Sequence, residues 1–191
     1  MKQIGGSLAG LIHGIMIKRL GHNVRILDQT RSSARTHQVA GMGTGPQGLE
    51  FSKKHDLDAR PYALACPGFQ MLDKQAKIKH ILNRPLNLTS WNVLYYRLRA
   101  NFDSFRSNFR PELPTKSEEE GKAVYDLGKR VTNVIHNDGL ITVEFDNLLS
   151  GGGGVVHADF VVVADGAFST SQRTITLDTL LGEAPCLGKR F

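Results

Sequence analysis

The chain opens with Met1–Leu11, "MKQIGGSLAGL", and the glycines of this stretch decide how the fold is interpreted. Gly5, Gly6 and Gly10 have the spacing of a tight turn that leads from a strand into a helix. The small Ser7 stands between them. Lys2, Gln3 and Ile4 leave only a short strand ahead of the turn, below the roughly five residues typical of strands.

The residues that follow supply the helix and a second strand. A helix is predicted over residues 8–20, because apolar residues recur there at steps of three and four. Lys18 and Arg19 in the last turn and Gly21 after it are typical of a helix C-terminus. Few residues of this helix are polar, so we expect most of it to be buried. The next residues, Asn23–Asp28 ("NVRILD"), predict a strand that ends in a carboxylate.

This turn, helix and strand are typical of a dinucleotide-binding unit. In such units the first glycine makes the tight turn, the small middle residue lets the backbone approach a pyrophosphate, and the last glycine lets helix and strand pack closely. The helix N-terminus offers amides and the positive end of its dipole to the phosphates. Asp28, eighteen residues after Gly10, is placed to bind the adenosine ribose. The alternative is a plain glycine-rich turn, and the unit alone does not choose between NAD(P) and FAD.

The middle of the chain predicts mainly helices and connections. A loop is expected at Gly41–Pro46 and a helix over residues 47–55. Residues 60–122 are interpreted as a helical segment and a connection, with an amphipathic helix from Ser90 to Phe105 and Ser90 or Thr89 as its N-cap.

The C-terminal half predicts strands, which begin at Ala123. A three-stranded β-meander is expected over residues 129–158, because strand-like segments flank "NDG" at residues 137–139, a strong hairpin signal. The run Phe160–Ala164 is continuous and apolar, which is typical of a strand buried on both faces of a parallel sheet.

A second motif follows that run, in "FVVVADGAFSTSQR" at residues 160–173. Asp165 stands at the expected carboxyl end of a central parallel strand, where ligands of open α/β sheets bind, and Gly166 permits close approach of the backbone. A simple Asp-Gly turn is the alternative interpretation.

Several segments together resemble the flavin-dependent aromatic hydroxylases, or class A flavoprotein monooxygenases. The branch concerned includes enzymes like 2,6-dihydroxypyridine 3-monooxygenase and salicylate hydroxylase. The resemblance covers almost all of residues 4–173 and implies an α/β, Rossmann-type FAD/NAD(P)-binding domain with the β-meander. The similar segments are "GGSLAGL", "ILDQ", "AGMGTGPQGLEF", "TSWNVLYYRLRANFD", "GKRVTNV" and "VVVADGAFSTSQR".

The resemblance implies FAD as cofactor, NAD(P)H as reductant and hydroxylation of an aromatic substrate with O₂. Arg35 would reach the cofactor from the loop after the second strand, although a solvated arginine is an equal alternative. Val131 would offer its backbone to the adenine, and Trp91, where many relatives have arginine, is interpreted as core packing. The full set of expected cofactor-binding residues is Gly5, Gly6, Ser7, Leu8, Ala9, Gly10, Asp28, Arg35, Val131, Asp165 and Gly166.

Composition excludes several other classes of protein. The net charge of +6 comes from scattered basic residues without a nucleic-acid recognition motif, so no nucleic-acid partner is expected. Cys66 and Cys186 have no metal-ligand spacing, and no metal is expected. The seven histidines are dispersed and provide no catalytic candidate, and the run Glu118–Glu120 is interpreted as a solvated acidic face. Without a signal peptide or membrane span, the sequence predicts a soluble, cytoplasmic protein; the oligomeric state is left open.

Relatives of this kind are roughly twice as long as this chain and continue into a substrate-binding domain. Nothing after Arg173 resembles that continuation, so residues 1–173 are interpreted as an incomplete FAD-binding domain, truncated before the substrate-binding domain, and residues 174–191 as an unassigned tail. Two functions stay open: the FAD-binding part of a monooxygenase, and a catalytically inactive remnant that retains a weakened dinucleotide-binding module. A third, an NAD(P)-binding module, is disfavoured by the meander and the Asp-Gly motif.

Overall fold

The computed structural model describes residues 1–35, 40–114, 119–137, 139–166 and 169, and it divides into two compact units. The first unit combines Met1–Gly10, His22–Ser33 and the chain from Lys122 onward, and the second combines Leu11–Gly21 with Ala34–Gly121. Predictions made for residues 174–191, for His37 and for Glu118 lie outside the described residues, as does most of the segment after Gly166.

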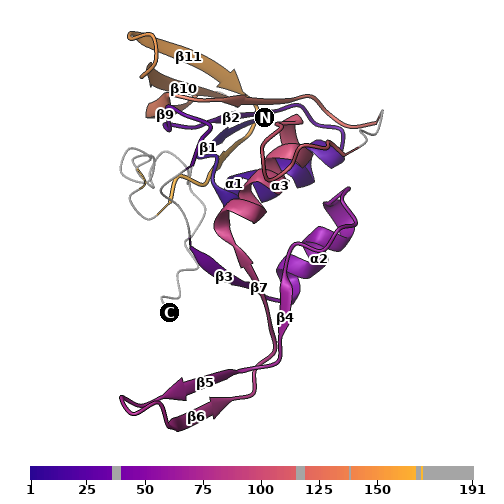
Figure 1. Ribbon diagram of the computed structural model, residues 1–191. Coiled ribbons are helices and arrows are strands. Elements are labelled where there is room, and N and C mark those ends of the chain that lie inside the picture. The colour runs from indigo at the N-terminus through magenta and orange to yellow at the C-terminus, as the bar shows by residue number, and fades with distance from the viewer. Residues whose placement is uncertain (36–39, 115–118, 138, 167–168, 170–191) are drawn as a thin grey trace, which may run out of the picture. The chain divides into compact units, whose positions relative to one another are not determined.

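A four-stranded parallel sheet is the centre of the first unit, and its strand order is β12-β1-β2-β8. Figure 1 labels β1 and β2 of this sheet. The pairing of β1 with β12 extends beyond the strands, because the Ala164 amide donates to the Ile4 carbonyl at 2.7 Å. The parallel α/β architecture predicted from the sequence is confirmed. Its strands are β1 (Lys2–Ile4), β2 (Val24–Leu27), β8 (Ala123–Asp126) and β12 (Val161–Val163).

The prediction that β12 is a central strand, buried on both faces, is wrong. Val161–Val163 are only half-buried, and Phe160 is 57% exposed. Within the described residues β12 stands at the end of the strand order and pairs with β1 alone. A strand at the end of a sheet has neighbours on one side only, so continuous apolar sequence is no guarantee of a central position.

The predicted β-meander is confirmed and packs on the parallel sheet. Its antiparallel order is β11-β10-β9. Ile4 and Leu27 from the parallel sheet share one hydrophobic core with Val131, Val143 and Phe145 from the meander. This core packs against the ends of β1 and β2, at Ile4 and Leu27. The strands are β9 (Lys129–Asn137), β10 (Leu140–Asn147) and β11 (Gly153–Ala158).

Helix α1 (Leu8–Arg19) forms as predicted but is less buried than expected. Its buried positions include Leu11, Ile15 and Lys18, which follow one stripe at steps of three and four. Met16 is 40% exposed and Leu20, just after the helix, is 74% exposed. A helix that buries one stripe leaves its other apolar side chains in solvent.

The second unit contains both remaining helices in their predicted places. Helix α2 spans Pro46–His55, and helix α3 spans Trp91–Asp103. Ser90 is the N-cap of α3, and its hydroxyl accepts from the Val93 amide at 3.3 Å. Helix α3 ends at Ser104, whose φ of 61° is left-handed.

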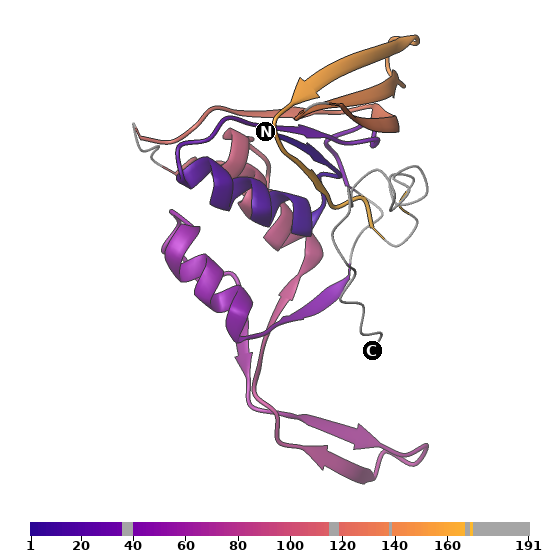
Figure 2. The ribbon, with the colours of Figure 1, turned by 180° about the vertical axis from the view of Figure 1, so that it is seen from behind.

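The rest of this unit contradicts the sequence prediction, because strands replace the loop at residues 41–46 and the helical segment from 60 to 90. Strands β3, β7 and β4 form an antiparallel sheet, and β5 pairs with β6 as a hairpin at the far end of the same arm (Figure 2). The Asp73 carboxylate turns that hairpin by accepting from the amides of Gln75 and Lys77, both at 2.9 Å. The strands are β3 (Gly41–Thr44), β4 (Leu64–Cys66), β5 (Phe69–Leu72), β6 (Ile78–Leu82) and β7 (Leu86–Ser90).

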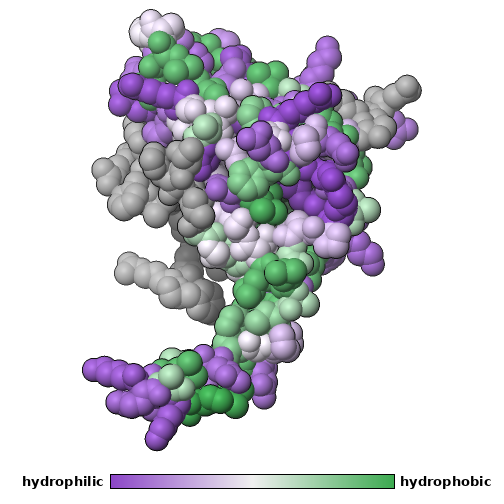
Figure 3. All heavy atoms as spheres, in the orientation of Figure 1, coloured by the Kyte–Doolittle hydropathy of each residue, from purple (hydrophilic) through white to green (hydrophobic). Residues whose placement is uncertain are grey.

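Apolar side chains gather in solvent along this β4–β7 arm (Figure 3). Leu64 is 78% exposed, and every residue of β6 is exposed. A two-stranded hairpin is only marginally stable by itself in water, so this arm draws little stability from burial. In the described part of the chain, no helix combines the length and hydropathy needed to cross a membrane.

Candidate functional site

Gly5 joins the carboxyl ends of three parallel strands. Its φ is +90°, and its amide donates to the Leu27 carbonyl at 2.9 Å, which ties the end of β1 to the end of β2. A Cβ at Gly5 would lie 2.3 Å from the Ala164 oxygen and 2.8 Å from the Asp165 Cα at the end of β12. Only glycine allows this approach, so the edge where the strands end is built around it.

Gly10 lets helix α1 start directly against the turn. A Cβ at Gly10 would lie 2.1 Å from the Gly5 oxygen, which is the close packing of helix and strand expected from the sequence. The first turn of the twelve-residue helix carries no acidic residue. Ser7 and Leu8 are half-buried and Ala9 is exposed. The N-terminus of α1 therefore presents backbone amides without a competing negative charge.

Asp28 is held firmly at the end of β2. It is 5% exposed, and its Oδ2 accepts from the Gly6 amide at 3.0 Å. Its Oδ1 accepts from the Thr30 amide at 2.7 Å, and its backbone carbonyl accepts from the Lys129 amide at 2.8 Å. The carboxylate is therefore fixed against the glycine turn. Gly6, one of the expected cofactor-binding residues, directs its amide to Asp28.

Tyr125 on β8 is a site residue that the sequence analysis missed. Its hydroxyl lies 2.8 Å from Asp28 Oδ2 and 2.8 Å from the Gly6 oxygen. A Cβ at Gly6 would lie 2.1 Å from this hydroxyl. No local pattern in the sequence indicates this role, because it depends on the parallel pairing of β2 with β8, in which Ile26 lies beside Tyr125.

The Asp-Gly motif follows β12 and lies next to the turn. Asp165 is half-buried and its Cα lies close to Gly5, as described above, whereas Gly166 is exposed with a φ of +89°. Ser169 donates its amide to the Gly166 carbonyl at 3.1 Å. Val131 is 6% exposed and lies in the same core as Ile4 and Leu27, the last residues of β1 and β2. The structure thus gathers Gly5, Gly6, Gly10, Asp28 and the Asp165 backbone at one edge.

Arg35 belongs to the second unit and is not a simple solvated arginine. It is half-buried, with its guanidinium carbon 5.1 Å from the centroid of the Tyr95 ring. Its amide donates to the Tyr96 hydroxyl at 3.1 Å. The contact with a cofactor that the resemblance implies for Arg35 stays a prediction.

The two arginines of α3, Arg97 and Arg99, have partners within the chain. Arg99 donates to Asp103 Oδ2 at 2.7 Å. Burial lowers the pKa of Arg99, but hydrogen bonding and charge from Asp103 and Tyr95 outweigh it and raise the pKa overall. Trp91 stacks on Tyr95 with ring centroids 4.6 Å apart, in agreement with the packing role expected for it.

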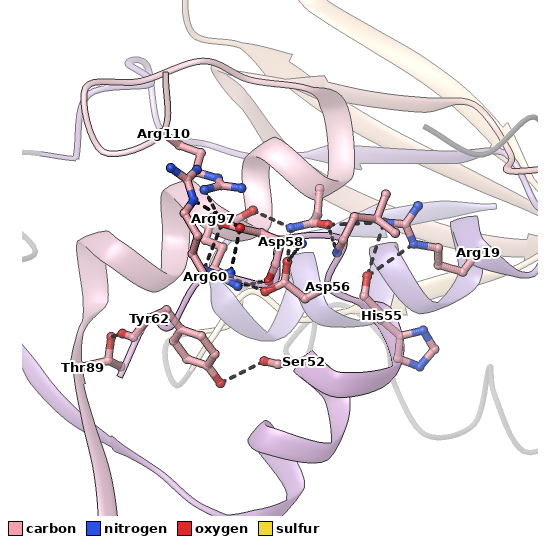
Figure 4. Close-up of polar contacts among 12 residues, drawn as sticks. Arg19, Ser52, His55, Asp56, Asp58, Arg60, Tyr62, Thr89, Arg97 and Arg110 are labelled. Atoms are coloured by element: carbon pink, nitrogen blue, oxygen red, sulfur yellow. Dashed lines mark hydrogen bonds and ion pairs between the residues drawn. The ribbon is translucent and has the colours of Figure 1, made fainter. Parts of the chain in front are cut away.

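Arg97 is the centre of a buried ion-pair cluster in the second unit (Figure 4). It is 7% exposed and pairs with Asp56 and Asp58, and Arg110 also pairs with Asp58. Asn101 donates to Asp56 Oδ1 at 2.9 Å. A hollow of about 500 Å³ adjoins this cluster. The buried charges neutralise one another. The ion pairs join Asp56 and Asp58, which follow α2, to Arg97 on α3 and to Arg110 beyond it.

Glu120 corrects the prediction of a solvated acidic face. Its side chain is 6% exposed and pairs with Lys18 and Arg19 of α1. The Lys18 Nζ lies 2.8 Å from Glu120 Oε2 and donates to the Asn101 carbonyl at 3.0 Å. At least one residue of this acidic run, Glu120, is therefore buried in ion pairs and not solvated.

A glycine turn between a parallel strand and a helix, with a fixed carboxylate at the end of the next strand, defines a Rossmann-type dinucleotide-binding domain. The sequence model for the FAD binding domain family matches residues 3–187. The chain therefore belongs to the FAD-binding domain family. Among curated proteins, no sequence matches significantly.

Solved structures of flavin-dependent monooxygenases share this fold. 2,6-Dihydroxypyridine-3-hydroxylase from Arthrobacter nicotinovorans matches 88% of this chain at 16% identity, with a TM-score of 0.65, over 37% of its own length. p-Nitrophenol 4-monooxygenase from Pseudomonas putida DLL-E4 matches 91% at 16% identity, with a TM-score of 0.66, over 42% of its length. The monooxygenase PieE, solved with FAD and substrate, matches 88% at 14% identity, with a TM-score of 0.68, over 30% of its length. The chain thus spans about two-fifths or less of these proteins, and the likeness concerns the fold.

Within the described ranges, no group of side chains could hold a metal ion.

Proposed function

We propose that this chain binds the ADP part of FAD at the Gly5–Gly10 turn and serves a flavin-dependent monooxygenase. The observation that carries the proposal is the Asp28 carboxylate, which is fixed on the Gly6 amide beside the N-terminus of α1. Vicinal ribose hydroxyls are donors that suit such a carboxylate, and pyrophosphate oxygens suit helix amides.

The residues present fit the cofactor. Gly5 and Gly10 keep side chains away from the turn, and a Cβ at either position would meet backbone atoms at 2.3 Å or less. Asp28 would hold the ribose, the residues Ser7–Gly10 the pyrophosphate, and Asp165 the linker toward the flavin. When bound, FAD would accept electrons from NAD(P)H and use O₂ to hydroxylate an electron-rich aromatic substrate. NAD(P)H, the aromatic substrate and a cytoplasmic location all belong to this proposal.

A binding module without turnover is the second candidate function. At the turn, the described groups are backbone amides, the Asp28 carboxylate and the Tyr125 hydroxyl, which bind ligands and perform no chemistry themselves. The purified chain separates the candidates. Visible flavin absorbance after reconstitution with FAD, followed by NAD(P)H oxidation that phenolic substrates stimulate, supports the monooxygenase. FAD uptake without stimulated oxidation supports the binding module, and no uptake contradicts both.

Replacing Asp28 with asparagine tests the observation that carries the proposal. We expect the Kd for FAD to rise about 10- to 100-fold, because hydrogen bonds to a charged group are stronger than those to a neutral amide. Fluorescence titration of FAD with the purified variant measures the change.

Asp146→Asn is the matched control for Asp28→Asn. Asp146 is an aspartate of the same unit, on the meander, where it pairs with Arg130 Nη2 at 2.6 Å and its side chain is 43% exposed. This variant should bind FAD as the unmodified chain does. Equal affinity in both variants would contradict the role given to Asp28.

A further inference from the structure

We propose that Tyr125 is a positioning residue of the adenosine site, whose hydroxyl orients Asp28 to select ligands that carry a ribose 2′,3′-diol. This inference rests on the proposed function, since it takes the ribose to be the ligand of Asp28. It assigns a specific task to a residue on β8, a strand outside the turn, helix and strand that define the binding motif.

The contacts of the tyrosine hydroxyl support a positioning role. It lies 2.8 Å from both Asp28 Oδ2 and the Gly6 oxygen, so its single proton has two acceptors. Donation to the charged carboxylate is the stronger of the two bonds. The Gly6 amide donates to the same Oδ2 at 3.0 Å. Tyr125 and Gly6 therefore hold one oxygen of the carboxylate from two different elements.

Gly6 and Tyr125 form a matched pair. A Cβ at position 6 would lie 2.1 Å from the Tyr125 hydroxyl and 2.4 Å from its Cζ, so the ring reaches Asp28 only because residue 6 has no side chain. The second glycine of the turn is thus explained by the tyrosine rather than by a phosphate. Since Thr30 fixes Oδ1 at 2.7 Å, the plane of the carboxylate is set by three segments of the first unit.

An oriented carboxylate discriminates between ligands through the diol. Two vicinal hydroxyls bind one carboxylate well only when its plane is already set, because orienting it during binding costs free energy. Phosphate contacts at the N-terminus of α1 do not involve this carboxylate. Loss of the Tyr125 hydroxyl should therefore weaken binding of a ligand with the diol and spare one without it.

Calorimetric titration of the full chain with ADP and with 2′,3′-dideoxy-ADP tests this. The unmodified chain should prefer ADP. In Tyr125→Phe the Kd for ADP should rise about tenfold, as expected for one lost hydrogen bond to a charged group, while the Kd for the dideoxy compound stays the same. If Tyr125 had a purely structural role, its substitution would raise the Kd of both ligands by the same factor. Tyr62→Phe is the matched control, because it removes a hydroxyl 2.9 Å from Ser52 Oγ in the second unit and should leave the preference intact.

The other outcomes are equally decisive. In an Asp28→Asn background, Tyr125→Phe should have no further effect on the preference, because the tyrosine acts through the carboxylate. An undiminished preference for ADP in Tyr125→Phe overturns the positioning role and leaves the proposed function standing. An unmodified chain that binds neither ligand overturns both. If Tyr125→Phe does not fold, a preference for ADP retained by Asp28→Asn alone overturns the inference.

Discussion

Replacing Arg97 with alanine is expected to lower the free energy of unfolding of the second unit by about 3 to 5 kcal/mol. Arg97 is 7% exposed, and the side chains of its partners Asp56 and Asp58 are 5% and 6% exposed. Without Arg97, Asp58 keeps Arg110, but the donors to Asp56 are then the Asn101 side-chain amide and the Asp58 backbone amide, which carry no charge. A buried carboxylate that loses its cation retains the full cost of leaving water.

Urea denaturation followed by tryptophan fluorescence measures this loss. Trp91 is the single tryptophan of the chain and starts helix α3, so its emission reports on the unit that contains Arg97. Arg60→Ala is the matched control within the same cluster. The Arg60 side chain is 54% exposed and its Nε lies 3.3 Å from Asp58 Oδ1, so its loss should cost about 0 to 1 kcal/mol. If both variants lowered the free energy of unfolding by a similar amount, burial would not explain the contribution of Arg97 to stability.

The fold was predictable where local pattern decides it. The ends of α1, α2 and α3 follow from three-and-four periodicity and from residues such as Gly21 and Ser90. Strands β3 to β7 were missed because glycine lies within β3, asparagine within β7, and proline next to β4 and β7 at Pro67 and Pro85, and these residues usually predict loops. Strand β3 forms by pairing with β7, more than forty residues along the chain, as in Gly41 with Ser90, and a local pattern contains no such information.

The residues of the candidate site also differ in whether a local sequence pattern could predict them. Gly5, Gly6 and Asp28 could be assigned to one site because a short, ordered motif links them, and in the structure the Gly6 amide donates to Asp28. Tyr125 could not, since its role depends on β8 lying beside β2, nearly a hundred residues away along the chain. The same reason hid the partners of Arg97, which are carboxylates 41 and 39 residues earlier in the chain. Side chains that act across elements need the strand order before they can be assigned.

Replacing Gly5 with alanine should destabilise the first unit by about 3 kcal/mol or more and abolish FAD uptake. Two costs add at this position. A φ of +90° is strained for any residue with a Cβ, and that Cβ would lie 2.3 Å from the Ala164 oxygen, a backbone atom that cannot rotate away. The end of β12 would have to separate from β1, and Asp165 would move with it. Urea denaturation followed by circular dichroism gives the stability, and hydrogen exchange of β1 and β12 locates the change.

Gly139→Ala separates the two costs of Gly5→Ala. Gly139 also has a positive φ, +81°, but an added Cβ would meet no atom within 4 Å. Its substitution should therefore cost only the backbone strain, about 1 to 2 kcal/mol, and leave exchange in β1 and β12 unchanged. The additional loss of unfolding free energy in Gly5→Ala, compared with Gly139→Ala, then measures the cost of disturbing the contact between the turn and the Asp-Gly motif. Equal losses in the two variants would mean that this contact is looser than 2.3 Å implies, and the close meeting of strand ends that positions Asp28 and Asp165 would lose its basis.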